Sequence, residues 1–263
     1  MNSRYTIRKE CKNLILFLLI SFLLPLASVA TQTMISNHFI CFILYGIQAA
    51  APTISAIIVL CLDKKVKSYF AQMFRKEHLK MAIILPFIIA GTTMILAKII
   101  FCVLSGKAFM LGNVSSIQFI IILWALLAEE IGWRGYLEPW LEAYGLHRRI
   151  VPCIVGAVWC LWHYHFFLRN GIQVPMPLFF ISCIVESYIY SFLMSVTNHN
   201  IVSAMIYHFA WNLLIHVTAI SPVDNNGSLF PYIILVILEV LVLPVCLSVR
   251  KINQQLAMEQ DRM

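Results

Sequence analysis

The sequence predicts an all-α fold, a polytopic transmembrane helical bundle of about eight spans that forms a single integral membrane domain over residues 1–263. Of the 263 residues, 61% are hydrophobic and only 12% are charged, whereas a soluble domain carries about 25% charged residues. The mean hydropathy is +0.85. Apolar runs long enough to cross a bilayer recur along the whole chain, which leaves no room for a soluble domain.

The apolar runs define the expected helices. A helix rises about 1.5 Å per residue, so about 20 apolar residues cross the hydrocarbon core of a bilayer. Prolines inside such runs are tolerated, because neighbouring helices satisfy the carbonyls that they free. The predicted spans are 13–30, 38–62, 81–104, 117–141, 150–168, 176–197, 200–218 and 230–249.

The positions of the cations predict the orientation of these spans. When eight spans alternate, 15 of the 19 Lys and Arg residues fall in the tails and connections on the side of the N-terminus. Cytoplasmic connections are enriched in Lys and Arg, so both termini are expected in the cytoplasm. The net charge of +7 then reports topology and indicates no nucleic-acid partner. The basic segment 63–80 predicts an amphipathic helix at the membrane surface.

The first span has a second interpretation. A basic start, an apolar stretch and the small residues Ala27 to Ala30 also resemble a cleavable signal peptide. The remaining seven spans keep the same orientation in either case.

The eight cysteines are scattered, mostly within the predicted spans, without a CxxC pair or a regular spacing. They therefore indicate neither a disulfide framework nor a zinc site, and we interpret them as packing residues.

The fourth span carries three charged residues near its middle, Glu129, Glu130 and Arg134. Insertion of a charged residue at mid-bilayer costs about 2.5–3.5 kcal/mol of free energy. Such a residue is therefore expected to have a charged partner, to face water or to serve a function. Glu130 and Arg134 are four residues apart and predict a structural ion pair. Adjacent helical residues point about 100° apart, so Glu129 is left to face another helix or water. Gly132 and Gly135 would let a neighbouring helix approach closely.

The fifth span contributes His163, and the seventh contributes His208 and Asn212 on one helical face. Taken singly, each histidine is readily explained as a hydrogen-bonded core residue. Together with the carboxylates, they form a set that can activate water and stabilise an oxyanion. Glu186 and Glu239 also lie in predicted spans but outside this set.

The chain lacks the residues that other classes of membrane protease use for catalysis. The chain has no HExxH sequence, and its three aspartates lie in connections or the tail, so an intramembrane aspartate pair is excluded. No GxSxG elbow occurs either.

These residues resemble the CPBP family of membrane proteins (CAAX proteases and bacteriocin-processing enzymes, also called Abi), whose pattern is EExxxR, FxxxH and HxxxN on successive helices. EEIGWR begins at Glu129, and HFAWN begins at His208. WCLWH places Trp159 where the family usually has phenylalanine, and it ends at His163. The resemblance covers a core of about 117–216, and the upstream segment 51–56 resembles a weaker family feature.

The resemblance implies glutamate-dependent hydrolysis of peptide bonds within the membrane, by one of two mechanisms. Without a metal, Glu129 assisted by His163 would activate water, His208 and Asn212 would hold the oxyanion, and Glu130 would pair with Arg134. With a divalent metal such as zinc, His163, His208 and Glu129 would be its ligands.

The expected function is therefore an intramembrane endopeptidase that acts on a membrane-associated protein or peptide, such as a CAAX-type protein or the precursor of a leader peptide, pheromone or bacteriocin. Its expected partners are membrane lipid and that substrate, and the sequence defines no oligomeric state. The alternative is a non-proteolytic bacteriocin-immunity or regulatory membrane protein. A proton-coupled transporter is a third hypothesis, although such proteins usually show internal repeats and this chain has none.

Overall fold

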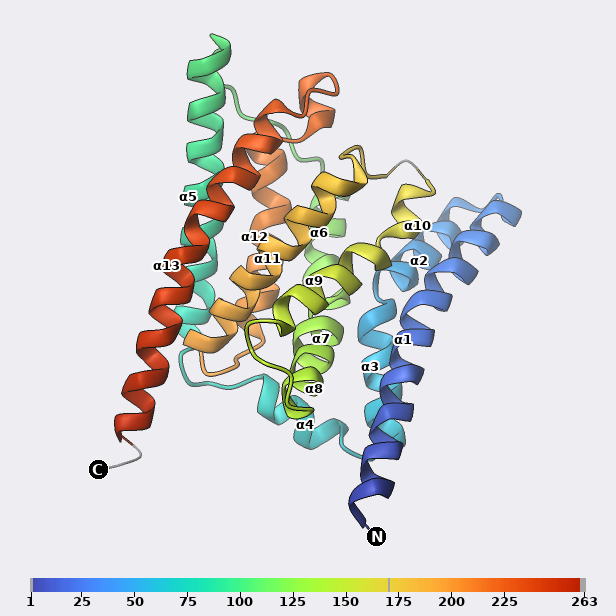
Figure 1. The fold of residues 1–263 in the computed structure, drawn as a ribbon. Helices are drawn as coiled ribbons and strands as arrows, with labels where there is room; N and C mark the ends of the chain where they lie inside the picture. The colour runs from blue at the N-terminus through green and yellow to red at the C-terminus, as the bar shows by residue number, and fades with distance from the viewer. Residues whose placement is uncertain (1, 170, 261–263) are drawn as a thin grey trace.

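A computed structural model describes residues 2–169 and 171–260, with side chains for 11–169 and 171–249. Helices make up its regular structure, and no strand occurs within these ranges. They pack side by side as one bundle (Figure 1). The predicted all-α class is confirmed.

Long helices alternate with short helical turns along the chain. In order, the elements are α1 (Asn2–Met34), α2 (His38–Ala49), α3 (Ala51–Leu62), α4 (Val66–Met73), α5 (Leu79–Ser105), α6 (Ser116–Ala128), α7 (Glu130–Gly132), the π-helical turn η1 (Trp133–Leu137), α8 (Glu138–Ala143), α9 (Val151–Trp162), α10 (Tyr164–Phe167), α11 (Met176–Val196), α12 (Val202–Val217), the short 3₁₀ turn η2 (Pro222–Asn225) and α13 (Phe230–Gln260).

Each of the eight predicted spans corresponds to helix in the structure. Within the described residues, six helical segments are long and apolar enough to cross a membrane. The number rises to seven if the bent pair α2 and α3 is counted as one span. The eighth segment, Val151–Phe167, is apolar but shorter. About 20 residues are needed for a full crossing, so this segment is shorter than a complete span.

The predicted span 38–62 is not one straight helix. It is divided into α2 and α3, which meet at an angle of 63°. Pro52 lies in the first turn of α3, where it has no N–H to donate to the carbonyl of Gln48, and this ends α2. The carbonyl of Gly46 in the last turn of α2 accepts hydrogen bonds from the Ala50 N–H and the Trp124 indole, both at 3.0 Å.

The predicted span 117–141 is also interrupted, at the two glutamates. The helix breaks at Glu129, and Trp133–Leu137 form a π-helical turn. The hydroxyl of Thr53 donates to the carbonyl of Leu127 at 3.0 Å, which satisfies one of the acceptors at the break. Turns of this wider kind are concentrated at functional sites in proteins. In this chain the break changes the direction of Glu129 relative to a regular helix.

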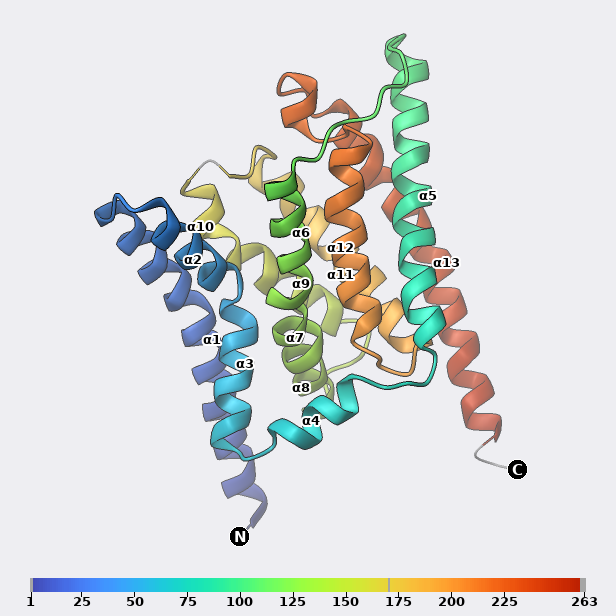
Figure 2. The ribbon, with the colours of Figure 1, turned by 180° about the vertical axis from the view of Figure 1, so that it is seen from behind.

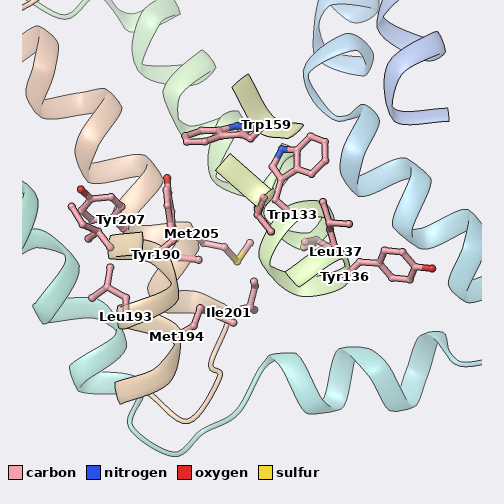
Figure 3. Packing of buried hydrophobic residues seen from close by; sticks show 14 of the residues in the cluster. Trp133, Tyr136, Leu137, Trp159, Tyr190, Leu193, Met194, Ile201, Met205 and Tyr207 are labelled. Carbon is pink, nitrogen blue, oxygen red and sulfur yellow. The ribbon is translucent and has the colours of Figure 1, made fainter. Parts of the chain in front are cut away.

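Two glycines allow neighbouring segments to approach this turn, as the sequence predicts. A Cβ atom on Gly132 would lie 2.5 Å from the Cβ and carbonyl carbon of Pro52. One on Gly135 would lie 2.6 Å from the sulfur of Met73. The buried side chains around the turn, among them Trp133, form the centre of the hydrophobic core (Figure 3).

The chain crosses one end of the bundle through α4. Both termini and α4 lie at this end (Figures 1 and 2), which we call the terminal end. The carbonyl of Met73 accepts the N–H of Ile201 at 3.0 Å, and the carbonyl of Arg75 accepts the side-chain amide of Asn200 at 2.6 Å. A helix is thus present within the segment 63–80, restricted to Val66–Met73, and its position at the membrane surface stays a prediction.

We expect Gly132→Ala to destabilise the protein by about 1–3 kcal/mol, because the added methyl meets the ring and backbone of Pro52 and neither can move independently. Gly91→Ala is the matched control, since its Cβ would meet only Leu214 at an ordinary 4.0 Å. Thermal unfolding of both variants in detergent measures the difference. Equal midpoints for the two variants would show that the contact with Pro52 is not tight.

Candidate active site

The structure brings four of the five predicted site residues to one cavity of about 690 Å³: Glu129, His163, His208 and Asn212 all line it. Glu129 lies at the break after α6, His163 immediately follows α9, and the other two lie one turn apart on α12. The fifth residue, Glu130, is fully buried behind the cavity wall.

The two carboxylate oxygens of Glu129 have different neighbours: one accepts a hydrogen bond from Trp159, and the other faces His208. The indole N–H of Trp159 donates to Oε2 at 2.7 Å. Oε1 lies 4.0 Å from Nε2 of His208, too far for a direct hydrogen bond. The side chain is only 5% exposed, so its orientation is restricted by packing as well as by the indole.

Glu130 joins Arg134 to His208. Its two oxygens accept Nη1 of Arg134 at 3.1 and 3.2 Å, which confirms the ion pair predicted from the spacing. Its Oε1 also lies 2.7 Å from Nδ1 of His208. A carboxylate oxygen accepts, so the proton of this contact lies on Nδ1, and Nε2 is the ring nitrogen that faces Glu129.

Arg134 connects the π-helical turn η1 to two further helices. Its Nη2 donates to the hydroxyl of Ser187 on α11 at 3.0 Å. The guanidinium carbon lies 3.8 Å from the ring centre of Tyr190 and 4.5 Å from that of Trp159. A buried guanidinium is stable only with such paired and stacked neighbours. Arg134 therefore contacts both α9 and α11 while it is paired with Glu130.

His163 is oriented by the end of its own helix. The backbone N–H of His163 donates to the carbonyl of Cys160, so the carbonyl of Trp159 does not accept it. That carbonyl instead lies 2.7 Å from Nδ1 of the His163 ring. A carbonyl only accepts, which places the proton on Nδ1 and leaves Nε2 as an acceptor.

Asn212 is the polar residue of the site with the most freedom. It lines the cavity one turn beyond His208. Among the described residues, none forms a hydrogen bond with its side chain, in contrast to the histidines and glutamates. Its amide is therefore available to a ligand in the cavity.

The cavity has two chemically different walls. Side chains from α2 and α6 form an apolar wall that includes Phe42, Ile43, Ile121 and Ala125. The facing wall, from α11, α12 and α13, carries polar groups. They include Glu186, Asn212, His216 and Tyr232. A cavity of this kind suits an amphipathic chain segment.

Sequence reasoning missed two features of this site. It treated Trp159 only as an aromatic replacement, but the indole N–H binds Glu129, which phenylalanine could not do. It also left Glu186 outside the site, whereas the structure places it in the cavity wall. The tryptophan at the position where the family pattern has phenylalanine was the available signal for the first, because an indole carries an N–H donor. Nothing in the spacing indicated the second.

The donor types would suit zinc, but their spacing does not. Two zinc ligands with bonds of about 2.0–2.1 Å lie about 3.3 Å apart in a tetrahedral site, whereas Glu129 and His208 are 4.0 Å apart. Across the part of the chain that the structure describes, no three His, Cys, Asp or Glu side chains are placed to hold a metal ion. We therefore derive no step through a metal, and the metal-bound mechanism stays the untested alternative to the metal-free one.

We expect Glu130→Ala to reduce stability by about 3–5 kcal/mol, because it leaves the buried guanidinium of Arg134 without its carboxylate. The double variant Glu130→Gln with Arg134→Met should recover much of this loss, since removing both charges leaves neither unpaired. Chemical unfolding in detergent micelles measures both. Arg148→Gln serves as the control. Nε of Arg148 lies 3.9 Å from Oε1 of Glu142 in a pair at the surface, so its loss should change the stability little. A double variant less stable than Glu130→Ala would show that the unpaired guanidinium is not the cause of the loss.

Comparison with known proteins identifies the same part of the chain. Residues 111–214 match the family model described as type II CAAX prenyl endopeptidase Rce1-like, and this segment contains all five predicted site residues. A protein named CAAX prenyl protease 2 from Methanococcus maripaludis is 25% identical over 210 residues, which cover 68% of this chain and 75% of that protein. The resemblance to the CPBP family, and within it to type II CAAX prenyl endopeptidases, is confirmed for this segment.

Proposed function

We propose that this integral membrane protein is an endopeptidase that hydrolyses a peptide bond of a membrane-associated protein or peptide inside the cavity. The observation that carries the proposal is the position of Glu129, with one oxygen bound by Trp159 and the other 4.0 Å from His208. A carboxylate with a free, oriented oxygen beside an imidazole can hold and deprotonate a water molecule. The Rce1-like family match supports the same activity.

In the proposed mechanism, the water lies between Oε1 of Glu129 and the substrate carbonyl. Nε2 of His163 accepts one hydrogen of the water, because its Nδ1–H is used by the Trp159 carbonyl. Glu129 takes the other proton as the water oxygen bonds to the carbonyl carbon. The carbon–nitrogen bond then breaks while Glu129 returns the proton to the leaving nitrogen, so the carboxylate is regenerated.

The developing oxyanion is stabilised from α12. Asn212 donates from its amide, and His208 donates from Nε2 when its ring is an imidazolium, with Nδ1–H held by Glu130. Removal of one such donor typically costs about 2.7–4 kcal/mol in the transition state. Glu130 and Arg134 act as positioning residues, since they fix His208 and do not line the cavity.

The substrate class follows from the two walls of the cavity. An apolar segment or a lipid chain would lie against α2 and α6, and the backbone around the scissile bond would face the polar side. The Methanococcus relative is named for CAAX prenyl proteins, which makes a prenylated C-terminal peptide one candidate. A leader peptide, pheromone or bacteriocin precursor is the other.

We expect Glu129→Gln and His163→Ala each to lower the cleavage rate at least about 100-fold, since each removes a group that handles the proton of water. The assay uses purified protein in lipid nanodiscs with a farnesylated CAAX peptide and an unprenylated amphipathic peptide, and mass spectrometry identifies the products. Glu77→Gln and His147→Ala, which lie outside the cavity lining, are the matched controls and should cleave like the wild type. Site variants that fold normally and retain full cleavage would refute the protease assignment. A wild type that cleaves neither peptide but binds one would favour the non-proteolytic alternative.

A metal-free mechanism makes a separate prediction. Cleavage should persist after incubation with 1,10-phenanthroline, and the purified active protein should contain less than one equivalent of zinc, because the described side chains do not form a metal cluster. Elemental analysis of the same sample measures the metal content. Loss of activity that added zinc restores would show instead that His163, His208 and Glu129 rearrange around a metal.

A further inference from the structure

The cavity wall contains a second glutamate, Glu186 of α11, which the proposed mechanism does not use. The hydroxyl of Ser182, one turn earlier on the same helix, donates to its Oε1 at 2.8 Å. The hydroxyl of Tyr232 on α13 in turn donates to Ser182 at 2.9 Å. A chain of two hydrogen bonds thus fixes the position of the Glu186 carboxyl in the wall.

The second oxygen of Glu186 has no donor. Among the described residues, none donates a hydrogen bond to Oε2, and none forms an ion pair with this carboxyl. The buried guanidinium of Arg134 is paired with Glu130 instead. A carboxylate inside an apolar bundle is stable only when a cation or several donors compensate its charge. Glu186 therefore has the capacity to bind one cationic group from a molecule in the cavity.

A neighbouring carboxyl adds to the acidic character of this wall. Glu239 of α13 is fully buried, and its Oε1 accepts the indole N–H of Trp211 at 2.9 Å. Its Oε2 and the hydroxyl of Tyr207 have no hydrogen-bond partner among the described residues. Of the charged residues, Glu239 has the largest electrostatic effect on Glu186, so a cation beside Glu186 would be attracted by both carboxyls.

Glu186 lies one helical turn from the candidate catalytic residues. Tyr190 follows four residues later on the same face of α11. Its ring centre is 5.9 Å from that of Trp159 and 6.4 Å from that of His208. An extended peptide advances about 3.3 Å per residue. A substrate side chain that reaches Glu186 therefore belongs to a residue within about four positions of the scissile bond.

From these contacts, we propose that Glu186 is a specificity-determining residue that binds the cationic side chain of a lysine or arginine in the peptide substrate. Such a side chain carries several N–H donors and no acceptor, which matches a carboxyl with a free oxygen. Its aliphatic stem can lie along the apolar part of the lining. The cleavage of that peptide rests on the proposed function, whereas its binding at Glu186 does not.

The test is a lysine scan of peptide affinity, measured by fluorescence anisotropy in lipid nanodiscs. The parent protein carries Glu129→Gln, which prevents hydrolysis during the measurement and removes the other free carboxyl oxygen of the cavity. The host is an apolar peptide of norleucine and alanine, acetylated and amidated at its ends, with a single lysine that replaces norleucine at successive positions. Norleucine keeps the apolar stem of lysine and lacks its charge.

We expect at least one lysine position to bind about 10-fold more tightly than the host peptide, as a charge-assisted hydrogen bond provides. Glutamate at that position should bind more weakly than norleucine, a comparison that needs no further variant. Glu186→Gln, which keeps the volume and the acceptor for Ser182, should abolish the gain from lysine and leave the affinity for the host peptide unchanged. Glu77→Gln, outside the cavity lining, is the matched control and should retain the gain.

A scan in which no lysine position improves binding would overturn the proposal, as would a gain that persists in Glu186→Gln. The outcome is separate from that of the cleavage assay. A lysine preference that requires Glu186, in a chain whose wild type cleaves no peptide, would keep the cation site and refute the protease assignment. Cleavage by the wild type without any lysine preference would do the reverse.

Discussion

Charged groups inside an apolar bundle are stable only when they are paired, and the contacts of Glu130 meet this requirement for three side chains. Glu130 accepts hydrogen bonds from Arg134 and from His208, and Arg134 extends the connection to Ser187 on α11. These contacts join the interrupted fourth span to α11 and α12. Removing any member would leave a buried polar group without a partner, so the position of His208 in the cavity depends on this one carboxylate.

The break in the fourth span gives the two adjacent glutamates separate environments. In a regular helix they would differ by about 100° in direction; in this chain the helix is also interrupted between them at Glu129. Glu130 is enclosed with Arg134, while Glu129 reaches the cavity and binds the indole of Trp159. The close contact of Gly132 with Pro52 holds the break in place. One carboxylate thus has a positioning role and the other is available for chemistry.

The cavity determines which molecules could use that chemistry. In its apolar wall, α2 precedes the matched segment 111–214 and α6 lies within that segment. Its polar wall comes from α11, α12 and α13. The bend between α2 and α3 places α2 against the upper part of α6, beside the cavity. The buried core that contains Trp133 and Ile201 lies between the site and α4 (Figure 3).

The sequence by itself determined the all-α class, the approximate ends of eight helical segments and the candidate residues, because apolar length and buried charge are local properties. It also predicted the pair of Glu130 and Arg134, since four residues in a helix fix that contact. Only the tertiary structure decided that His208 binds Glu130, that Trp159 binds Glu129 and that Glu186 lines the cavity. Those contacts join residues from different helices, and their geometry depends on the bends at Ala50 and Glu129, which the apolar pattern does not encode.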